Sequence, residues 1–280
     1  MFWKPLTLLV LIALTGCGGG STSEAGTATS STGATSASDK PKPRIAPAGA
    51  VVYPAAKATG LIKGTVSLDG NAPEMKTIDI SGAPQCAALH KVPLRKEEIV
   101  VKDGKLANAV VYVTSVDGKA IEDVWTFSAP TAPVVLDQKD CTYHPHVLAI
   151  QVDQTVNIVS SDDLVHNVHY SGANKESNDS FQKVNDSKPK TFSEKELGGA
   201  FVCNVHGWMK AFVNVFPHPF FAVSADDGTY TLPKLPPGEY AVNVWHESAN
   251  DSGKLVPVDA VSVKVGDNAI TVQDFKLKVK

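Results

Sequence analysis

The 280-residue sequence is poor in cysteine, methionine and aromatic residues, and it has no long basic run. It contains four cysteines, three methionines and 7% aromatic residues, and its formal net charge is -3. Because lysines occur only in short clusters, the chain lacks the electrostatic footprint of a nucleic-acid-binding protein, and no nucleic-acid partner is expected. With so few cysteines, we look for a separate role for each.

Long helical patterns and the common catalytic motifs are also missing. The longest helix-like piece covers only residues 83–89. No serine, histidine and aspartate arrangement for nucleophilic catalysis is visible, and the glycines at 18–20 belong to a linker-like tract rather than to a phosphate-binding loop. What the chain does have is valine, glycine and proline in short β-type runs, which predicts an all-β protein with one or two modest domains and a tail.

The N-terminus, residues 1–17, has the features of an export segment. Lys4 precedes an apolar run at residues 6–14, which is too short to span a bilayer. The run leads into a Leu-Thr-Gly-Cys sequence that ends at Cys17 and resembles the lipobox of bacterial lipoproteins. The resemblance implies a lipid anchor on Cys17 and a place in the bacterial cell envelope, on the periplasmic face of the outer membrane if the envelope is Gram-negative. An ordinary signal peptide cut nearby is the alternative.

Residues 18–57 are predicted to form a disordered linker. Up to about residue 50 they are almost all Gly, Ser, Thr and Ala, with a Pro-Lys-Pro-Arg sequence, and such a tract buries too little apolar surface to offset its ordering entropy. A flexible chain of this length has a root-mean-square reach of about 30 Å. We expect it to act as a tether.

Two separated regions, 58–130 and 218–280, predict strands. Expected strands cover residues 60–68, 108–114, 256–265 and 269–278, and Asp-Gly turn pairs follow the first two. With the Asp-x-Gly-x-Tyr-x-Leu and Pro-Pro-Gly-x-Tyr sequences at 226–240, the two regions together resemble one transthyretin-like, carboxypeptidase-regulatory-like domain. The resemblance implies a β-sandwich that could bind an envelope protein or a glycan. Either a second domain is inserted in this sandwich, or two small domains lie in tandem.

The segment between them, 131–217, holds a concentration of metal-ligating residues. Cys203, His206 and Met209 lie on one short loop between two apolar runs, in FVCNVHGWMKAFVNVF, and the upstream run SDDLVHNVHY supplies His166. One Cys and two His with a long, weak Met bond form the blue-copper electron-transfer arrangement. A buried cysteine with two incidental histidines is the alternative.

This segment resembles a cupredoxin over its whole length. Strands are expected at residues 133–136, 146–152, 155–159, 165–170, 201–203 and 211–216. SSDDLVHNV departs from the family pattern by one serine, and the ligand loop has the short amicyanin-like spacing. The resemblance implies a Greek-key β-sandwich that binds one type 1 copper through His166, Cys203, His206 and Met209. It also implies that Asn167 hydrogen-bonds across to the ligand loop.

Several histidines compete with these assignments. His169 is the main rival of His166, but a spacing of three along a strand places it on the opposite face. His146 is expected to serve in a turn or in packing, and His218, between two prolines, in a linker. His246, which precedes a glutamate, is expected to lie at a hydrogen-bonded strand end.

Cys86 and Cys141 remain once Cys17 is assigned to lipid and Cys203 to copper. Because paired thiols normally oxidise in exported proteins, we predict a disulfide between them, which would stabilise the fold by about 3–4 kcal/mol. A second Cys/His metal site with His90 and His146 is the alternative.

The expected function is a membrane-tethered one-electron carrier. It would dock an unidentified redox protein through the apolar surface around His206, with Trp208 in the docking patch or packed between the domains. The competing hypothesis is a copper-binding, sensing or interaction module. We expect no enzymatic activity, because copper reductases and oxidases need a second metal centre with several further histidines.

Overall fold

The computed structural model describes residues 47–181, 183–250 and 253–280, and they form an all-β protein, which confirms the predicted fold class. The export segment, Cys17 and most of the 18–57 linker lie outside the described residues. All described residues belong to one compact unit, residues 41–280. Within them, no helix has the length and apolar character needed to cross a membrane.

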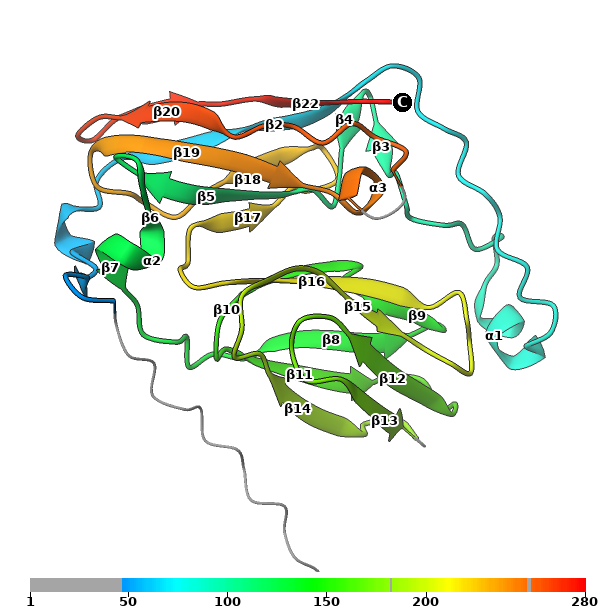
Figure 1. Cartoon of the computed structure of the whole chain (residues 1–280). Helices are drawn as coiled ribbons and strands as arrows, with labels where there is room; N and C mark the ends of the chain where they lie inside the picture. Colours follow the sequence, from blue (N-terminus) through cyan, green and yellow to red (C-terminus); the bar gives the residue numbers. More distant parts are fainter. Residues whose placement is uncertain (1–46, 182, 251–252) are drawn as a thin grey trace, which may run out of the picture. The chain divides into compact units, whose positions relative to one another are not determined.

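Strands β8 to β16 form two facing sheets (Figure 1). One sheet has the order β10-β16-β15-β12-β13 and the other β14-β11-β8-β9. Side chains alternate between buried and exposed positions, as in β11, because successive residues of a strand point to opposite faces. The strands are β8 (Val134–Lys139), β9 (Thr142–His144), β10 (Val147–Gln151), β11 (Thr155–Ser160), β12 (His166–Ser171), β13 (Ser177–Phe181), β14 (Ser187–Thr191), β15 (Glu196–Val202) and β16 (Lys210–Phe216).

The remaining main strands form a second pair of sheets. One has the order β17-β5-β19-β20, with β6 also on β5, and in the other β2 pairs with β4, β18, β21 and β22, while β3 pairs with β4. Strands from before and after the β8–β16 segment therefore share both sheets. They are β2 (Leu61–Asp69), β3 (Val101–Lys102), β4 (Lys105–Leu106), β5 (Val110–Val116), β6 (Lys119–Ala120), β17 (Phe221–Val223), β18 (Thr229–Thr231), β19 (Gly238–Trp245), β20 (Val261–Val265), β21 (Ile270–Val272) and β22 (Phe275–Lys278).

The end of the expected linker is ordered, contrary to the prediction for residues 18–57. Strand β1 (Val51–Val52) pairs with β7 (Trp125–Thr126), and the short helix η1 (Ala55–Lys57) follows. Tyr53 explains the order. Its ring packs against Trp125, Phe127 and Phe220, and its hydroxyl donates to a backbone carbonyl. Burial of one aromatic ring supplies the apolar contact that the preceding Gly/Ser/Thr tract lacks.

A small apolar cluster joins the two groups of sheets. Val110, Val147, Phe212, Phe216 and Trp245 are buried together, and they come from β5, β10, β16 and β19. His218 lies beside this cluster, stacked between the rings of Phe216 and Phe220, and it is only 3% exposed. The expectation that His218 is a linker residue is therefore wrong, because its aromatic neighbours bury it.

Helix α1 (Pro84–Leu89) lies on the long connection between β2 and β3 (Figure 1). A disulfide joins Cys86 of this helix to Cys141, with the two sulfur atoms 2.06 Å apart. Cys141 and Asp140 form the two-residue turn between β8 and β9, and both have φ of 52°, in the left-handed region. Two-residue hairpin turns of the type I′ require this backbone, which asparagine and glycine adopt more readily than cysteine. The two other short helices are α2 (Ile121–Val124) and α3 (Glu247–Asn250).

Candidate metal centre

The loop between β15 and β16 places Cys203, His206 and Met209 on one tight turn. The backbone N–H of Cys203 donates to the Met209 carbonyl at 3.2 Å, and the N–H of Met209 donates to the His206 carbonyl at 2.9 Å. The N–H of His206 donates to the Cys203 Sγ at 3.4 Å. These bonds close the loop on itself. The loop joins the antiparallel strands β15 and β16, so the backbone holds all three side chains close together.

His166, the first residue of β12, brings the second imidazole to this loop. Its Nδ1 lies 3.0 Å from the Nδ1 of His206, and the Cys203 Sγ lies 3.9 Å from the same His206 nitrogen. The ligand atoms of the three residues all lie within 4.8 Å of one another. Ring nitrogens and thiolates bind metal ions at about 2.0–2.3 Å, so one ion fits between these atoms. His166 and Cys203 are fully buried and His206 is partly exposed.

Met209 follows in the same loop and is 1% exposed. It belongs to the buried cluster that also contains Cys203. One thiol and two imidazoles close together, on a loop that also carries a buried methionine, supply the donor types of a blue-copper site, and the residues present therefore fit copper.

Asn167 connects the His166 strand to the ligand loop. Its Oδ1 accepts from the backbone N–H of Asn204 at 2.6 Å, and its Nδ2 donates to Asn178 on β13 at 2.6 Å. His169 points elsewhere: its Nε2 pairs with the exposed Glu176 at 2.6 Å. The structure thus brings His166, and not His169, to the loop.

Asp162 belongs to the candidate site, and sequence reasoning missed it. One carboxylate oxygen accepts from the N–H of Asp140 at 2.7 Å, and the other accepts from the N–H of Cys141 at 2.8 Å and pairs with the Nε2 of His166 at 3.0 Å. Asp162 is 6% exposed, whereas its neighbour Asp163 lies on the surface. The sequence SDDLVH contains both aspartates, and nothing in it distinguishes them.

The surroundings of Cys203 and His166 shift both side chains toward their charged forms. Burial lowers the pKa of His166, but the hydrogen bond to Asp162 and the Cys203 sulfur outweigh it and raise the pKa to about 9. Burial raises the pKa of the Cys203 thiol, but hydrogen bonds from His166 and from backbone N–H groups, including that of Asn167, bring it below its ordinary value. Burial and the neighbouring His166 lower the pKa of His206.

Trp208 packs inside the structure at the edge of this centre. Its Nε1–H donates to the Cys141 carbonyl at 2.9 Å, and its ring centroid lies 5.2 Å from that of His206. The ring is partly buried against the core of the β8–β16 sheets. The indole therefore connects the ligand loop to the β8–β9 turn, and part of its surface stays exposed.

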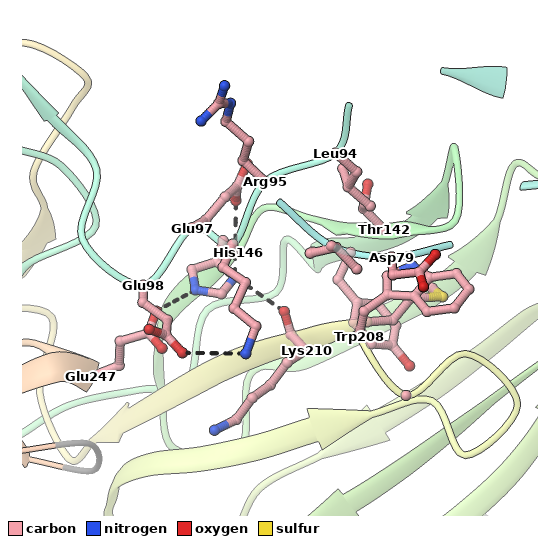
Figure 2. A pocket seen from close by; sticks show the side chains of 15 residues that line it. Asp79, Leu94, Arg95, Glu97, Glu98, Thr142, His146, Trp208, Lys210 and Glu247 are labelled. Atoms are coloured by element: carbon pink, nitrogen blue, oxygen red, sulfur yellow. Dashed lines mark hydrogen bonds and ion pairs between the residues drawn. The ribbon is translucent and has the colours of Figure 1, made fainter. Parts of the chain in front are cut away.

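A cavity of about 450 Å³ adjoins the ligand loop (Figure 2). Gly207, Trp208 and Met209 line one part of it, and Glu97 and Glu98 line another.

His146 lies in a hydrogen-bonded network on the wall of this cavity. Its Nδ1–H donates to the Lys210 carbonyl at 3.0 Å, and its Nε2 pairs with the buried Glu247. Burial lowers the pKa of His146, but the hydrogen bond and the charge of Glu247 raise it by more, so the pKa lies above its ordinary value. His146 packs edge-on against the Phe212 ring, in line with the expected packing role, and its contact with Glu247 also links the residue before β10 to α3.

Comparisons with known proteins find partial structural likeness. No protein-family model matches the chain, and no curated protein matches it. Solved structures that it resembles include cupredoxins and a copper-containing nitrite reductase, each at low identity. A copper-containing nitrite reductase from Thermus scotoductus is 20% identical with a TM-score of 0.27, covering 37% of this chain and 25% of that one. A reduced mutant of amicyanin is 22% identical, with a TM-score of 0.28 and coverage of 31% and 86%. A purple cupredoxin from Nitrosopumilus maritimus is 21% identical, with a TM-score of 0.26 and coverage of 29% and 98%.

Proposed function

We propose that this protein is a type 1 copper protein that carries single electrons between redox partners in the cell envelope. The observation that carries the proposal is the convergence of His166, Cys203 and His206, whose ligand atoms lie within 4.8 Å of one another in a largely buried pocket. Copper bound there would supply a one-electron couple, with Met209 as the weak fourth ligand.

The chain's own residues hold this site in one geometry. His166 is oriented by Asp162, and the ligand loop is fixed by Asn167 through the N–H of Asn204. Residues that support the ligands of a metal site set their orientation and basicity. A site held this way from two strands rearranges little when the oxidation state changes, which suits electron transfer.

The route of the electron and the protein's place in the cell are part of the proposal. The partly exposed His206 is the edge through which a redox protein would exchange electrons, beside Trp208. Cys17 would carry the lipid anchor, and the linker would let the folded part reach its partner. The proposal includes no enzymatic step.

The first test is an optical and electron paramagnetic resonance spectrum of the purified protein after addition of Cu(II). An intense visible thiolate-to-copper band with narrow copper hyperfine splitting is the expected result, and a Cys203→Ser variant should lack both. A colourless wild-type protein with an ordinary tetragonal copper signal would reject the type 1 site. A blue centre that exchanges electrons only slowly would favour the copper-binding or sensing function instead.

A further inference from the structure

The Cys86–Cys141 disulfide lies against the candidate metal centre. Its two sulfur atoms and a ring nitrogen of His206 all lie within 4.8 Å of one another. Both cysteines are buried, with exposures of 1% and 0%, in the same core cluster as Cys203 and Met209. His206 therefore has sulfur-bearing residues on two sides, a thiol on one and a disulfide on the other.

The residues around the disulfide hold its two halves together by contacts other than the S–S bond. At Cys141 the backbone N–H donates to Asp162 and the carbonyl accepts from Trp208. His90, which follows α1, hydrogen-bonds through its Nε2 to the Asp140 carbonyl at 2.8 Å. The His90 bond ties the C-terminal end of α1 to the β8–β9 turn, and the other two bonds hold that turn beside the ligand loop. We therefore expect the two sulfur atoms to stay close to each other and to His206 if the S–S bond is opened.

We propose that the Cys86–Cys141 pair is a latent Cu(I) site that a dithiol reductant opens. The dithiol supplies two electrons and two protons, the S–S bond breaks, two S–H bonds form, and the reductant leaves as its own disulfide. Disulfide sulfur is a poor metal ligand, whereas two thiolates and an imidazole form a soft donor set that selects Cu(I). Binding of the ion displaces the thiol protons and uses His206 as the third ligand.

The proposal concerns a second site, and it does not rest on a type 1 centre. His206 is shared by both sets of residues, so an ion at the dithiol would compete with one at Cys203 for this imidazole. The redox state of Cys86 and Cys141 would then decide which soft-metal site the protein offers.

The test uses purified protein that carries Cys203→Ser, which removes the thiolate of the first site. Cu(I) is added without oxygen in competition with a coloured Cu(I) chelator, before and after treatment with dithiothreitol and its removal. We expect the reduced protein to hold one Cu(I) more than about tenfold more tightly than the oxidised protein, with thiolate-to-Cu(I) absorption in the ultraviolet. Adding Cys86→Ser and Cys141→Ser should abolish the difference, and adding His206→Ala should diminish it. Equal Cu(I) affinity in the two redox states would overturn the proposal.

A melting experiment covers the case in which reduction loosens the fold. An ion that binds only the folded state raises the melting temperature by mass action. Cu(I) should therefore raise the melting temperature of the reduced Cys203→Ser protein more than that of its oxidised form, and an equal shift would contradict the site. Because Cys203 is absent, this outcome is independent of the Cu(II) spectrum that tests the proposed function.

Discussion

The carboxylate of Asp162 lies 3.0 Å from the Nε2 of His166, and the same carboxylate accepts the backbone N–H of Cys141 at 2.8 Å. One buried side chain thus fixes a candidate copper ligand and the turn that carries the disulfide. The negative charge also stabilises the imidazolium of His166. Burial raises the pKa of Asp162, but the hydrogen bonds from His166 and from the N–H groups of Cys141 and Asp140 together outweigh it and bring the pKa below its ordinary value. Asp162 is therefore a positioning residue for the metal centre.

Replacing Asp162 with asparagine should weaken copper binding. The amide keeps the shape but removes the charge and turns one acceptor into a donor, so at least one of the three bonds is lost. Loss of such a support costs about 10–100-fold in metal affinity. Chelator competition with Cu(II) measures the effect. Asp163→Asn removes the same charge from the neighbouring, exposed residue, and it should change the copper affinity by no more than about twofold. Equal losses in the two variants would mean that charge alone, and not position, matters.

His166→Ala should abolish the visible absorption of the copper-loaded protein, whereas His169→Ala should retain it. Only the His166 Nδ1 faces His206, while His169 pairs with Glu176 at the surface. The His169 change should alter the free energy of unfolding by no more than about 0.5 kcal/mol, as is usual for exposed sites. Absorption that survives in the first variant and disappears in the second would reverse the ligand assignment.

The affinity for copper should rise with pH up to about pH 9. In the metal-free protein the pKa of His166 is about 9, so at neutral pH its imidazole is charged and must lose a proton when a metal binds. This group alone makes the affinity fall about tenfold for each pH unit below 9. Isothermal titration of Cu(II) in two buffers of different ionisation enthalpy counts the released protons. A constant affinity between pH 6 and 9 would show that His166 is neutral.

Trp208→Phe and Trp208→Ala separate docking from support. Phenylalanine keeps an aromatic ring near His206 but loses the bond to the Cys141 carbonyl, worth about 1 kcal/mol, and alanine loses both. If the indole face docks the partner, electron exchange should slow in the alanine variant and change little with phenylalanine, with the copper spectrum intact in both. Stopped-flow mixing with a redox protein measures the exchange. A bleached centre in either variant would make the indole structural.

The sequence predicts the strands and the meeting of His166, Cys203 and His206 better than it predicts what supports them. The meeting could be predicted because Cys203 and His206 lie on one short loop and the resemblance to cupredoxins indicates His166 as their upstream partner. Strands β13 and β14 were missed, since SNDSF and SKPKT are polar and lie at sheet edges, where burial leaves little pattern. Asp162 and the pairing of His146 with Glu247 depend on residues that meet only through the tertiary fold, and Glu247 is 101 positions from its partner.

Acid should destabilise the protein through two buried histidines. Burial lowers the pKa of His218 and of His246 to about 4, against an ordinary value of 6.5. Below pH 6.5 these two histidines therefore bind protons in the unfolded chain, whereas in the folded chain they stay neutral until about pH 4. Stability falls across this window, by about 3 kcal/mol for each histidine at its lower end, and nothing from this source is lost above pH 6.5.

His218→Asn isolates one of these contributions. The asparagine oxygen can accept the N–H of Phe220, which His218 Nδ1 accepts at 3.2 Å, but the side chain does not titrate. Loss of stacking should make the variant less stable than the wild type at pH 7, yet its free energy of unfolding should fall less between pH 6.5 and 4. Urea unfolding at several pH values gives the free energy of unfolding as a function of pH for the variant and the wild type. The control His144→Asn, at an exposed position, should show the wild-type pH dependence. An unchanged pH dependence in the His218 variant would mean that folding does not lower the pKa of this imidazole.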